Sequence, residues 1–183
     1  MKKKILISVL VIVVALGAYV AYSVNKSSKL SPRSTAAFNA LGLEIKVDYG
    51  RPSKRGRLIF GEEKDNALQP YGKYWRLGAN AATEITFSKN VMFGGKPVNA
   101  GTYRMYTVPN AKTWQVILNS EVGVAFGAVE PDHELDVLTV EVPVENIPAE
   151  TEQLTIDFAT DTTTILMNIM WDKVLVRVPI ALQ

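Results

Sequence analysis

The chain has 183 residues, one histidine and no cysteine, and 48% of its residues are hydrophobic. It therefore has no disulfide, no thiolate nucleophile and no lipid anchor on a cysteine, and a multi-histidine metal site is excluded. The net charge is +2 for the whole chain but −3 for residues 31–183, so the basic excess belongs to the N-terminal lysines and gives no support to nucleic-acid binding.

The N-terminus predicts a membrane helix. Lys2, Lys3 and Lys4 precede residues 5–24, which carry no charge. About 20 apolar residues are needed for a helix to cross roughly 30 Å of hydrocarbon. Lysines at one end hold that end on the cytoplasmic side. We therefore expect a single-pass protein of the inner membrane, anchored through residues 5–24, with the remainder extracytoplasmic and periplasmic.

A cleaved signal peptide is the alternative interpretation of this segment, because a basic start and an apolar core are common to both. Ala21-Tyr22-Ser23 is the small-x-small triplet near the end of the run. The run is longer than the usual signal-peptide core of about 7 to 15 residues, which favours the anchor. Both interpretations place the rest of the chain outside the cytoplasm.

Three parts are expected: residues 1–24 as anchor or signal peptide, residues 25–35 as a serine-rich tether, and residues 36–183 as one domain. The domain shows a period of two, with apolar and polar residues alternating around residues 43–49, 84–88, 102–107 and 114–118. A turn-like segment at 108–112 and further apolar segments at 135–142, 153–158, 164–170 and 174–180 complete the pattern. Eight to ten short strands predict an all-β domain, a single antiparallel β-sandwich that could be a jelly roll.

Two loops stand out from this pattern. Residues 49–57 (YGRPSKRGR) hold four positive charges, and the guanidinium groups of Arg51 and Arg57 are suited to a carboxylate, sulfate or phosphate. The alternative is that these arginines form ion pairs with the acidic second half of the chain. Residues 70–84 add Trp75, Arg76 and Asn80, which favour a core anchor beside a turn and are also typical of a polar-ligand cleft.

Several blocks of the sequence resemble one family. They are Tyr49-x-Arg51-Pro52-Ser53-x-x-Gly56-Arg57-x-Ile59-Phe60-Gly61, Trp75-Arg76-x-Gly78-Ala79-Asn80, Gly95-Lys96-x-x-x-Ala100-Gly101-Thr102-Tyr103, Met170-Trp171 and Val178-Pro179-Ile180. In this order they resemble the DUF2911 family of exported bacterial proteins, from about Ser31 to Ala181. The resemblance implies a secreted or envelope-anchored β-rich domain and carries over no catalytic residue. The chain departs from the family in its anchor, since a signal peptide is the commoner start.

No catalytic motif is present. The chain lacks the G-x-S-x-G, P-loop, H-E-x-x-H and G-x-G-x-x-G patterns. His133 lies among carboxylates in a segment that predicts an acidic surface turn, and we expect neither a metal site nor a cofactor. The sequence favours a non-catalytic binding module for a polar or anionic envelope ligand, such as a small molecule or saccharide, with Arg51, Arg57, Trp75, Arg76 and Asn80 as its contacts. The alternative is a hydrolase or transferase acting on an envelope polymer through carboxylates such as Glu84, Asp157 and Asp172.

Overall fold

The computed structural model describes residues 2–40, 42–161 and 164–183. One α-helix, α1 (Lys2–Leu30), precedes a domain made of strands. The strands are β1 (Arg33–Ala40), β2 (Leu43–Gly50), β3 (Phe60–Gly61), β4 (Gln69–Pro70), β5 (Thr83–Phe87), β6 (Val91–Phe93), β7 (Lys96–Val98), β8 (Gly101–Val108), β9 (Thr113–Asn119), β10 (Asp136–Asp161) and β11 (Thr164–Leu182). Two short 3₁₀ turns, Glu63–Asp65 and His133–Leu135, lie in the connections.

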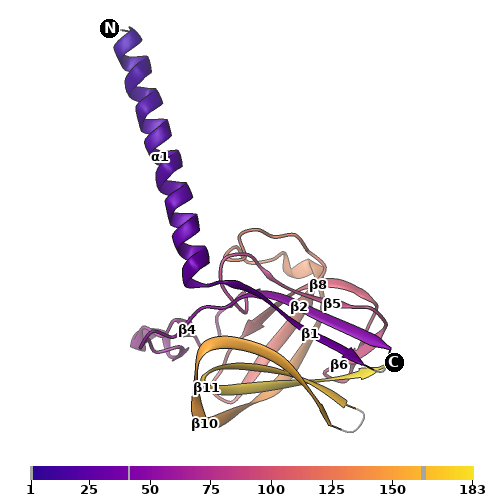
Figure 1. The fold of residues 1–183 in the computed structure, drawn as a ribbon. Coiled ribbons are helices and arrows are strands. Elements are labelled where there is room, and N and C mark those ends of the chain that lie inside the picture. The colour runs from indigo at the N-terminus through magenta and orange to yellow at the C-terminus, as the bar shows by residue number, and fades with distance from the viewer. Residues whose placement is uncertain (1, 41, 162–163) are drawn as a thin grey trace.

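Helix α1 stands away from the domain (Figure 1). Its segment Val9–Leu30 is long and apolar enough to cross a membrane, and no residue of its most apolar stretch is buried. A signal sequence has the same features. Beyond residue 24 the structure differs from the expected tether of residues 25–35: the helix continues to Leu30, and β1 begins at Arg33. Serine and lysine are compatible with a helix that is already nucleated, so polarity alone did not mark its end.

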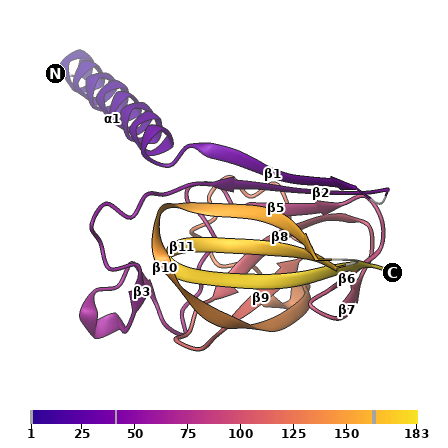
Figure 2. The same cartoon turned by 60° about the horizontal axis from the view of Figure 1, so that its bottom comes forward.

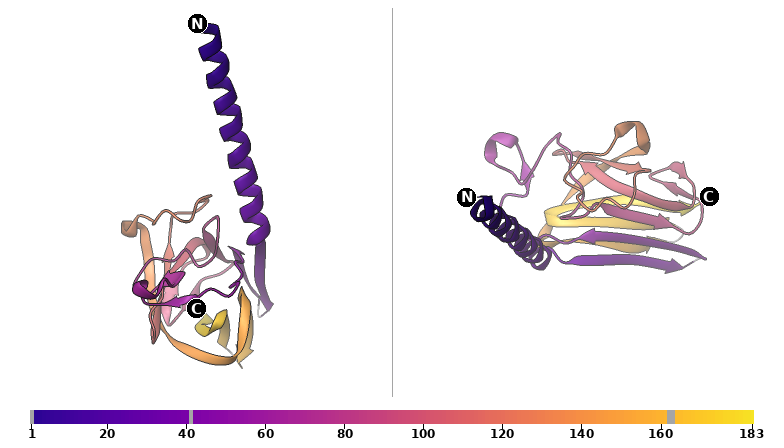
Figure 3. Two further views of the ribbon diagram at one scale, coloured as in Figure 1. Left: turned by 90° about the vertical axis from the view of Figure 1, so that its left-hand side faces the viewer. Right: turned by 90° about the horizontal axis from the view of Figure 1, so that it is seen from above.

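The large sheet has nine strands in the order β1-β2-β5-β8-β9-β10-β11-β6-β7, and each neighbouring pair is antiparallel. It folds over on itself so that β10 and β11 lie in front of β5 and β8 (Figure 2). Strand β10 makes the turn between the layers, pairing first with β9 and then with β11. The views in Figure 3 show the resulting two layers. The all-β sandwich expected from the sequence is confirmed.

The last two strands are longer than the sequence pattern indicates. Residues 136–161 form one strand, although the pattern separates residues 135–142 from 153–158. Its pairing with β11 shifts between Asn146 and Thr155, where the chain bends across Pro148. Such irregularities increase the local bend and twist of a strand, which is what a strand passing from one layer to the other requires.

The core lies between the layers and is centred on four aromatic rings. Trp75, Trp114, Trp171 and Phe60 contact one another, with ring centroids 4.9 to 6.1 Å apart. Trp75 is 3% exposed and Trp114 is 1% exposed. Both tryptophans therefore pack in the core, and Trp75 is the core anchor that the sequence left open beside a role as ligand contact. Contacts of this kind add roughly 0.5 to 1.5 kcal/mol per ring pair to the stabilisation from buried area.

Residues 104–107 of β8 are buried on both faces, whereas the alternation around residues 102–107 places Arg104 and Tyr106 on the polar, solvent-facing side. Arg104 is 1% exposed and Tyr106 is 2% exposed. Segment 121–136 covers this face and supplies the partners: Glu121 for Arg104, at 2.6 Å, and Asp136 for the Tyr106 hydroxyl, at 2.8 Å. A period of two reports which side chains share a face, but it does not reveal that a later loop covers the second face.

Candidate functional site

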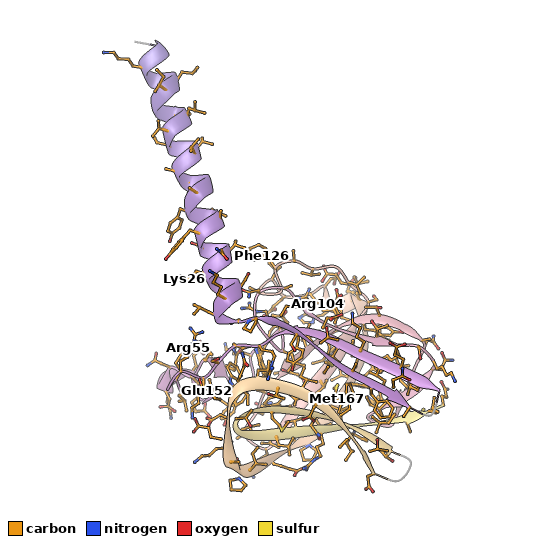
Figure 4. All side chains as sticks on the ribbon, viewed as in Figure 1. Lys26, Arg55, Arg104, Phe126, Glu152 and Met167 are labelled. Atoms are coloured by element: carbon orange, nitrogen blue, oxygen red, sulfur yellow. The ribbon has the colours of Figure 1, made fainter. Side chains whose placement is uncertain are left out.

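A cavity of about 250 Å³ lies where the end of α1 meets two loops of the domain. We call it the basic cavity. Its walls come from the end of α1, the loop after β2, the start of β4, residues 76–80 and Trp171. The polar side chains that line it are Ser27, Ser31, Ser53, Arg55, Arg57, Gln69, Arg76 and Asn80. In Figure 4, Arg55 and Glu152 lie just below the lower end of the helix.

Two glycines bring the loops together. A side chain at Gly50 would place its Cβ 2.2 Å from the Ala79 carbonyl oxygen, and one at Gly78 would lie 2.9 Å from the Gly50 oxygen. Glycine permits this approach because it has no Cβ. Gly78 also has a φ of 159°, and Asn80 adopts the left-handed region with a φ of 65°. The end of β2 and the 76–80 segment are therefore held against each other.

Arg76 combines partial burial with the lack of a counter-charge among the described residues. Its side chain is half-buried, and its Nε is fully enclosed without a hydrogen-bond partner. Among the described residues, no carboxylate lies within ion-pair distance of its guanidinium. Burial lowers the pKa of this guanidinium. A cation removed from water without a counter-charge is costly, and an anion entering the cavity would offset that cost.

The guanidinium groups of the other two arginines of the cavity contact main-chain carbonyls, and the backbone N–H of Arg55 donates to Glu152 Oε1 at 2.9 Å. Arg57 donates from Nε to the Lys54 oxygen at 2.9 Å and from its terminal nitrogen to the Ser53 oxygen. Arg55 donates to the Leu30 oxygen at the end of α1, at 2.8 Å. Main-chain carbonyls position a guanidinium but leave its full positive charge unneutralised. The basic cavity thus combines three arginine side chains with no acidic residue among those that line it.

The neighbouring lysine behaves differently. The Lys54 ammonium lies 2.7 Å from Asp172 and 3.0 Å from Glu150. These contacts raise the pKa of Lys54, chiefly through the hydrogen bond to Asp172. Ion pairing between the basic first half and the acidic second half, which the sequence left open, therefore involves Lys54 and does not involve Arg57.

Asn80 joins the helix to the domain. The Ser27 hydroxyl donates to Asn80 Oδ1 at 2.5 Å, and Asn80 Nδ2 donates to the Ser31 carbonyl at 3.4 Å. Left-handed backbone is more accessible to asparagine than to most residues, which suits this turn. Asn80 therefore has a structural task, holding the helix end, and at the same time forms part of the cavity wall.

The structure brings three of the five predicted site residues together and leaves two elsewhere. Arg57, Arg76 and Asn80 line the basic cavity. Arg51 instead donates to the Leu154 oxygen at 3.0 Å and to Thr155 Oγ1 at 2.9 Å, which fixes the loop to β10. Trp75 points into the core, away from the cavity.

The cavity residues that sequence reasoning left out of the site include Arg55, Gln69 and Trp171. Arg55 had a detectable signal, because it lies in the basic loop and is followed by glycine. Its φ is 52°, an uncommon conformation for a residue with a side chain. Gln69 and Trp171 had none, since only the folded chain brings β4 and β11 to this place.

A second polar cluster lies on the face of β8. The Arg104 guanidinium contacts Glu121, the Tyr74 hydroxyl at 2.7 Å and the Val129 carbonyl at 2.5 Å. The Tyr106 hydroxyl contacts Asp136 and His133 Nδ1. Burial, and then the bond to Asp136, raise the pKa of Tyr106. Both terminal nitrogens of Arg104 have partners within this cluster, which therefore holds segment 121–136 on the sheet, while the buried Nε of Arg104 has no hydrogen-bond partner among the described residues.

His133 differs in part from its predicted role. It lies at an exposed turn, as expected, but its Nδ1 also contacts the Tyr106 hydroxyl at 3.0 Å and Asp136 at 3.3 Å. Within residues 2–40, 42–161 and 164–183 no group of three or more histidines and carboxylates is arranged to hold a metal ion.

Comparison with known proteins gives one match. The model of a family described as a protein of unknown function, DUF2911, matches residues 31–180. No curated protein and no solved structure matches the chain.

Proposed function

Because the chain belongs to the DUF2911 family, whose function is unknown, its activity has to be argued from its own site, and we propose that it is a membrane-anchored, extracytoplasmic module that binds an anionic ligand in the basic cavity. Arg76 would bind the anion directly, and Arg57 and Arg55 would complete its charge compensation. Asn80 and Gln69 would contribute amide groups. The ligand group would be a carboxylate, sulfate or phosphate, as in a charged saccharide or another acidic envelope molecule.

The half-buried, unpaired guanidinium of Arg76 carries the proposal. Buried cations in folded proteins are normally paired, because the desolvation cost otherwise remains. Arg76 meets no such partner in the described part of the chain. The cavity size supports a small ligand or one group of a larger one, since about 250 Å³ is just below the usual range for drug-sized molecules.

The cavity favours ligand binding over a catalytic mechanism that uses carboxylates. A glycoside hydrolase needs two carboxyl groups about 5 to 10 Å apart in a concave site. None of the residues that line the basic cavity is acidic. Two of the carboxylates considered from the sequence have other partners: Glu84 accepts from the Gly123 N–H at 2.6 Å, and Asp172 accepts from Lys54.

The location outside the cytoplasm is also part of the proposal. It rests on the three lysines before the apolar segment and on the length of α1. Mass spectrometry of the protein extracted from membranes should show an intact N-terminal segment. A mature N-terminus near Val24 would show instead that the segment is a signal peptide.

The ligand proposal is tested by titration calorimetry on the full chain in nonionic detergent, with phosphate, sulfate, citrate and glucuronate as probes. We expect saturable binding of at least one anion to the parent and loss of at least about tenfold in affinity for Arg76→Met. Arg177→Met is the matched control, because Arg177 is paired with Glu145 away from the cavity. Equal affinities of the parent and Arg76→Met, or no binding by the parent, would contradict the proposal.

A further inference from the structure

A second, larger cavity adjoins the basic one. It has a volume of about 670 Å³ and lies between the last turns of α1 and two loops of the domain, residues 79–81 and 125–126. The helix contributes Tyr19, Val20, Ser23 and Val24, and the facing loop contributes Ala125 and Phe126. We call it the apolar groove. Phe126 is 70% exposed, and in Figure 4 it lies beside the lower part of the helix.

The apolar groove and the basic cavity adjoin each other. Four residues line both: Ser27, Ser31, Ala79 and Asn80. The Ser27 to Asn80 hydrogen bond marks the boundary between them. An elongated molecule could therefore place a charged end against Arg76 and an apolar end along the helix.

The position of the apolar groove along α1 indicates its depth relative to the membrane. Starting at residue 5, about 20 helical residues at 1.5 Å each span roughly 30 Å, so the hydrocarbon ends near Val24. Tyr19 and Val20 then lie at the level of the acyl chains of the outer leaflet. Ser27 and Ser31 lie at the level of the headgroups, together with the basic cavity. Tyr19 and Tyr22 are also typical of a membrane interface.

Exposed apolar residues on the same loop support this depth. Val122, Phe126 and Val129 are 49%, 70% and 67% exposed, although they belong to the domain and not to the helix. Apolar side chains grouped beside a membrane-spanning helix indicate contact with the bilayer, because no protein segment in the described part of the chain covers them.

We propose that the ligand is an anionic membrane lipid, with its phosphate in the basic cavity at Arg76 and an acyl chain in the apolar groove. The proposal rests on the anion site described above and names its ligand. Charge complementarity selects an anionic headgroup, and the continuity of the groove with the membrane-spanning helix selects a lipid over a soluble anion.

Native mass spectrometry of the full chain tests this. The protein is released from nonionic detergent after incubation with equal amounts of phosphatidylglycerol and phosphatidylcholine. We expect phosphatidylglycerol to be retained at least about fivefold more often than phosphatidylcholine. Equal retention of the two lipids, or retention of neither, would overturn the lipid proposal.

Two loop variants separate the groove from the anion site. Ala125 is exposed and lines the apolar groove, so Ala125→Trp fills the groove without touching Arg76. Ala128→Trp is the matched control on the same loop, because Ala128 is exposed and lines neither cavity. We expect Ala125→Trp to lose phosphatidylglycerol but to keep the affinity of the parent for soluble anions, and Ala128→Trp to behave as the parent. Thermal melts verify that both are folded.

The outcomes distinguish the two proposals. Soluble-anion binding that depends on Arg76, together with unchanged lipid retention in Ala125→Trp, would overturn the lipid proposal and leave the anion site standing. Lipid retention that is unaffected by Arg76→Met would overturn the lipid proposal, because the lipid phosphate would then not lie at Arg76, whereas the anion site is overturned only by the calorimetry described above.

Discussion

Arg104 and Arg76 are the same type of residue in two opposite environments. Arg104 is 1% exposed, and its terminal nitrogens contact a carboxylate, a tyrosine hydroxyl and a main-chain carbonyl. Arg76 is only half-buried but has no carboxylate among the described residues, and burial lowers its pKa. The charge of Arg104 is compensated within the fold, whereas that of Arg76 has no counter-charge among the described residues.

The difference teaches how to separate structural from ligand-binding charges in this protein. If burial alone were the criterion for a functional charge, Arg104 would be chosen, because it is the more enclosed of the two. If the criterion is a missing counter-charge, Arg76 is the candidate for ligand binding, because the protein does not offset the cost of its desolvation. Four predictions test this distinction, from the largest effect on stability to the smallest.

The largest effect is expected at Trp75, which connects the two regions. Its main chain exchanges hydrogen bonds of 2.8 and 2.9 Å with Thr107 on β8, the strand that carries Arg104. Trp75→Ala should lower the free energy of unfolding by about 3 to 5 kcal/mol through the cavity it leaves. Urea denaturation measures this. Val137→Ala, at a 46% exposed position, is the control and should change stability by less than about 0.5 kcal/mol.

Removal of Arg104 should have the next largest effect. Arg104→Met leaves the Tyr74 hydroxyl and the Val129 carbonyl without a donor, and we expect a loss of about 2 to 4 kcal/mol in urea denaturation. Glu121→Gln should cost about 1 kcal/mol, because the Glu121 side chain is 40% exposed. A loss below about 1 kcal/mol for Arg104→Met would remove the contrast with Arg76.

Removal of Arg76 should leave stability nearly unchanged. Arg76→Met breaks no ion pair and relieves the desolvation of a cation, so the free energy of unfolding should stay within about 1 kcal/mol of the parent. The same denaturation experiment, without added anions, measures it. A loss as large as that of Arg104→Met would show that Arg76 stabilises the fold through a partner and is not reserved for a ligand.

The smallest expected effect is on stability at alkaline pH, through the two tyrosines beside Arg104. Burial raises the pKa values of Tyr74 and Tyr106 above the ordinary 10.0. The folded state then keeps protons that the unfolded state has lost, so stability is complete below about pH 10 and falls as the pH rises further. In thermal melts between pH 9 and 11, stability of Tyr106→Phe should therefore fall less steeply with pH than that of the parent. The difference in slope should correspond to about one proton fewer released on unfolding. An unchanged slope would indicate that Tyr106 ionises normally.

The strands were largely predictable because burial on one face imposes a period of two. In β2, Leu43, Ile45 and Val47 are fully buried, as the alternation requires. The burial of Arg104 and Tyr106 was not predictable, because their cover comes from a segment remote in sequence. The continuation of α1 to Leu30 was also missed, since its polar residues favour no single structure.

The candidate site was predicted in part. The arginines of residues 49–57 and Arg76 indicated an anion-binding site, because strand periodicity does not require charges and glycines to be concentrated in loops. The choice among those arginines was not visible. Arg51 binds β10 and Arg57 lines the cavity, and this difference depends on the direction in which each side chain leaves the turn.

The comparison of the two arginines is tested most directly by their side-chain Nε–Hε signals in one ¹H–¹⁵N spectrum of the full chain in detergent. Both nitrogens are buried and lack a protein acceptor, and the spectra of Arg76→Met and Arg104→Met assign them. On titration with phosphate, the Arg76 signal should shift saturably while the Arg104 signal stays in place. A stationary Arg76 signal, or equal shifts of both, would contradict the account.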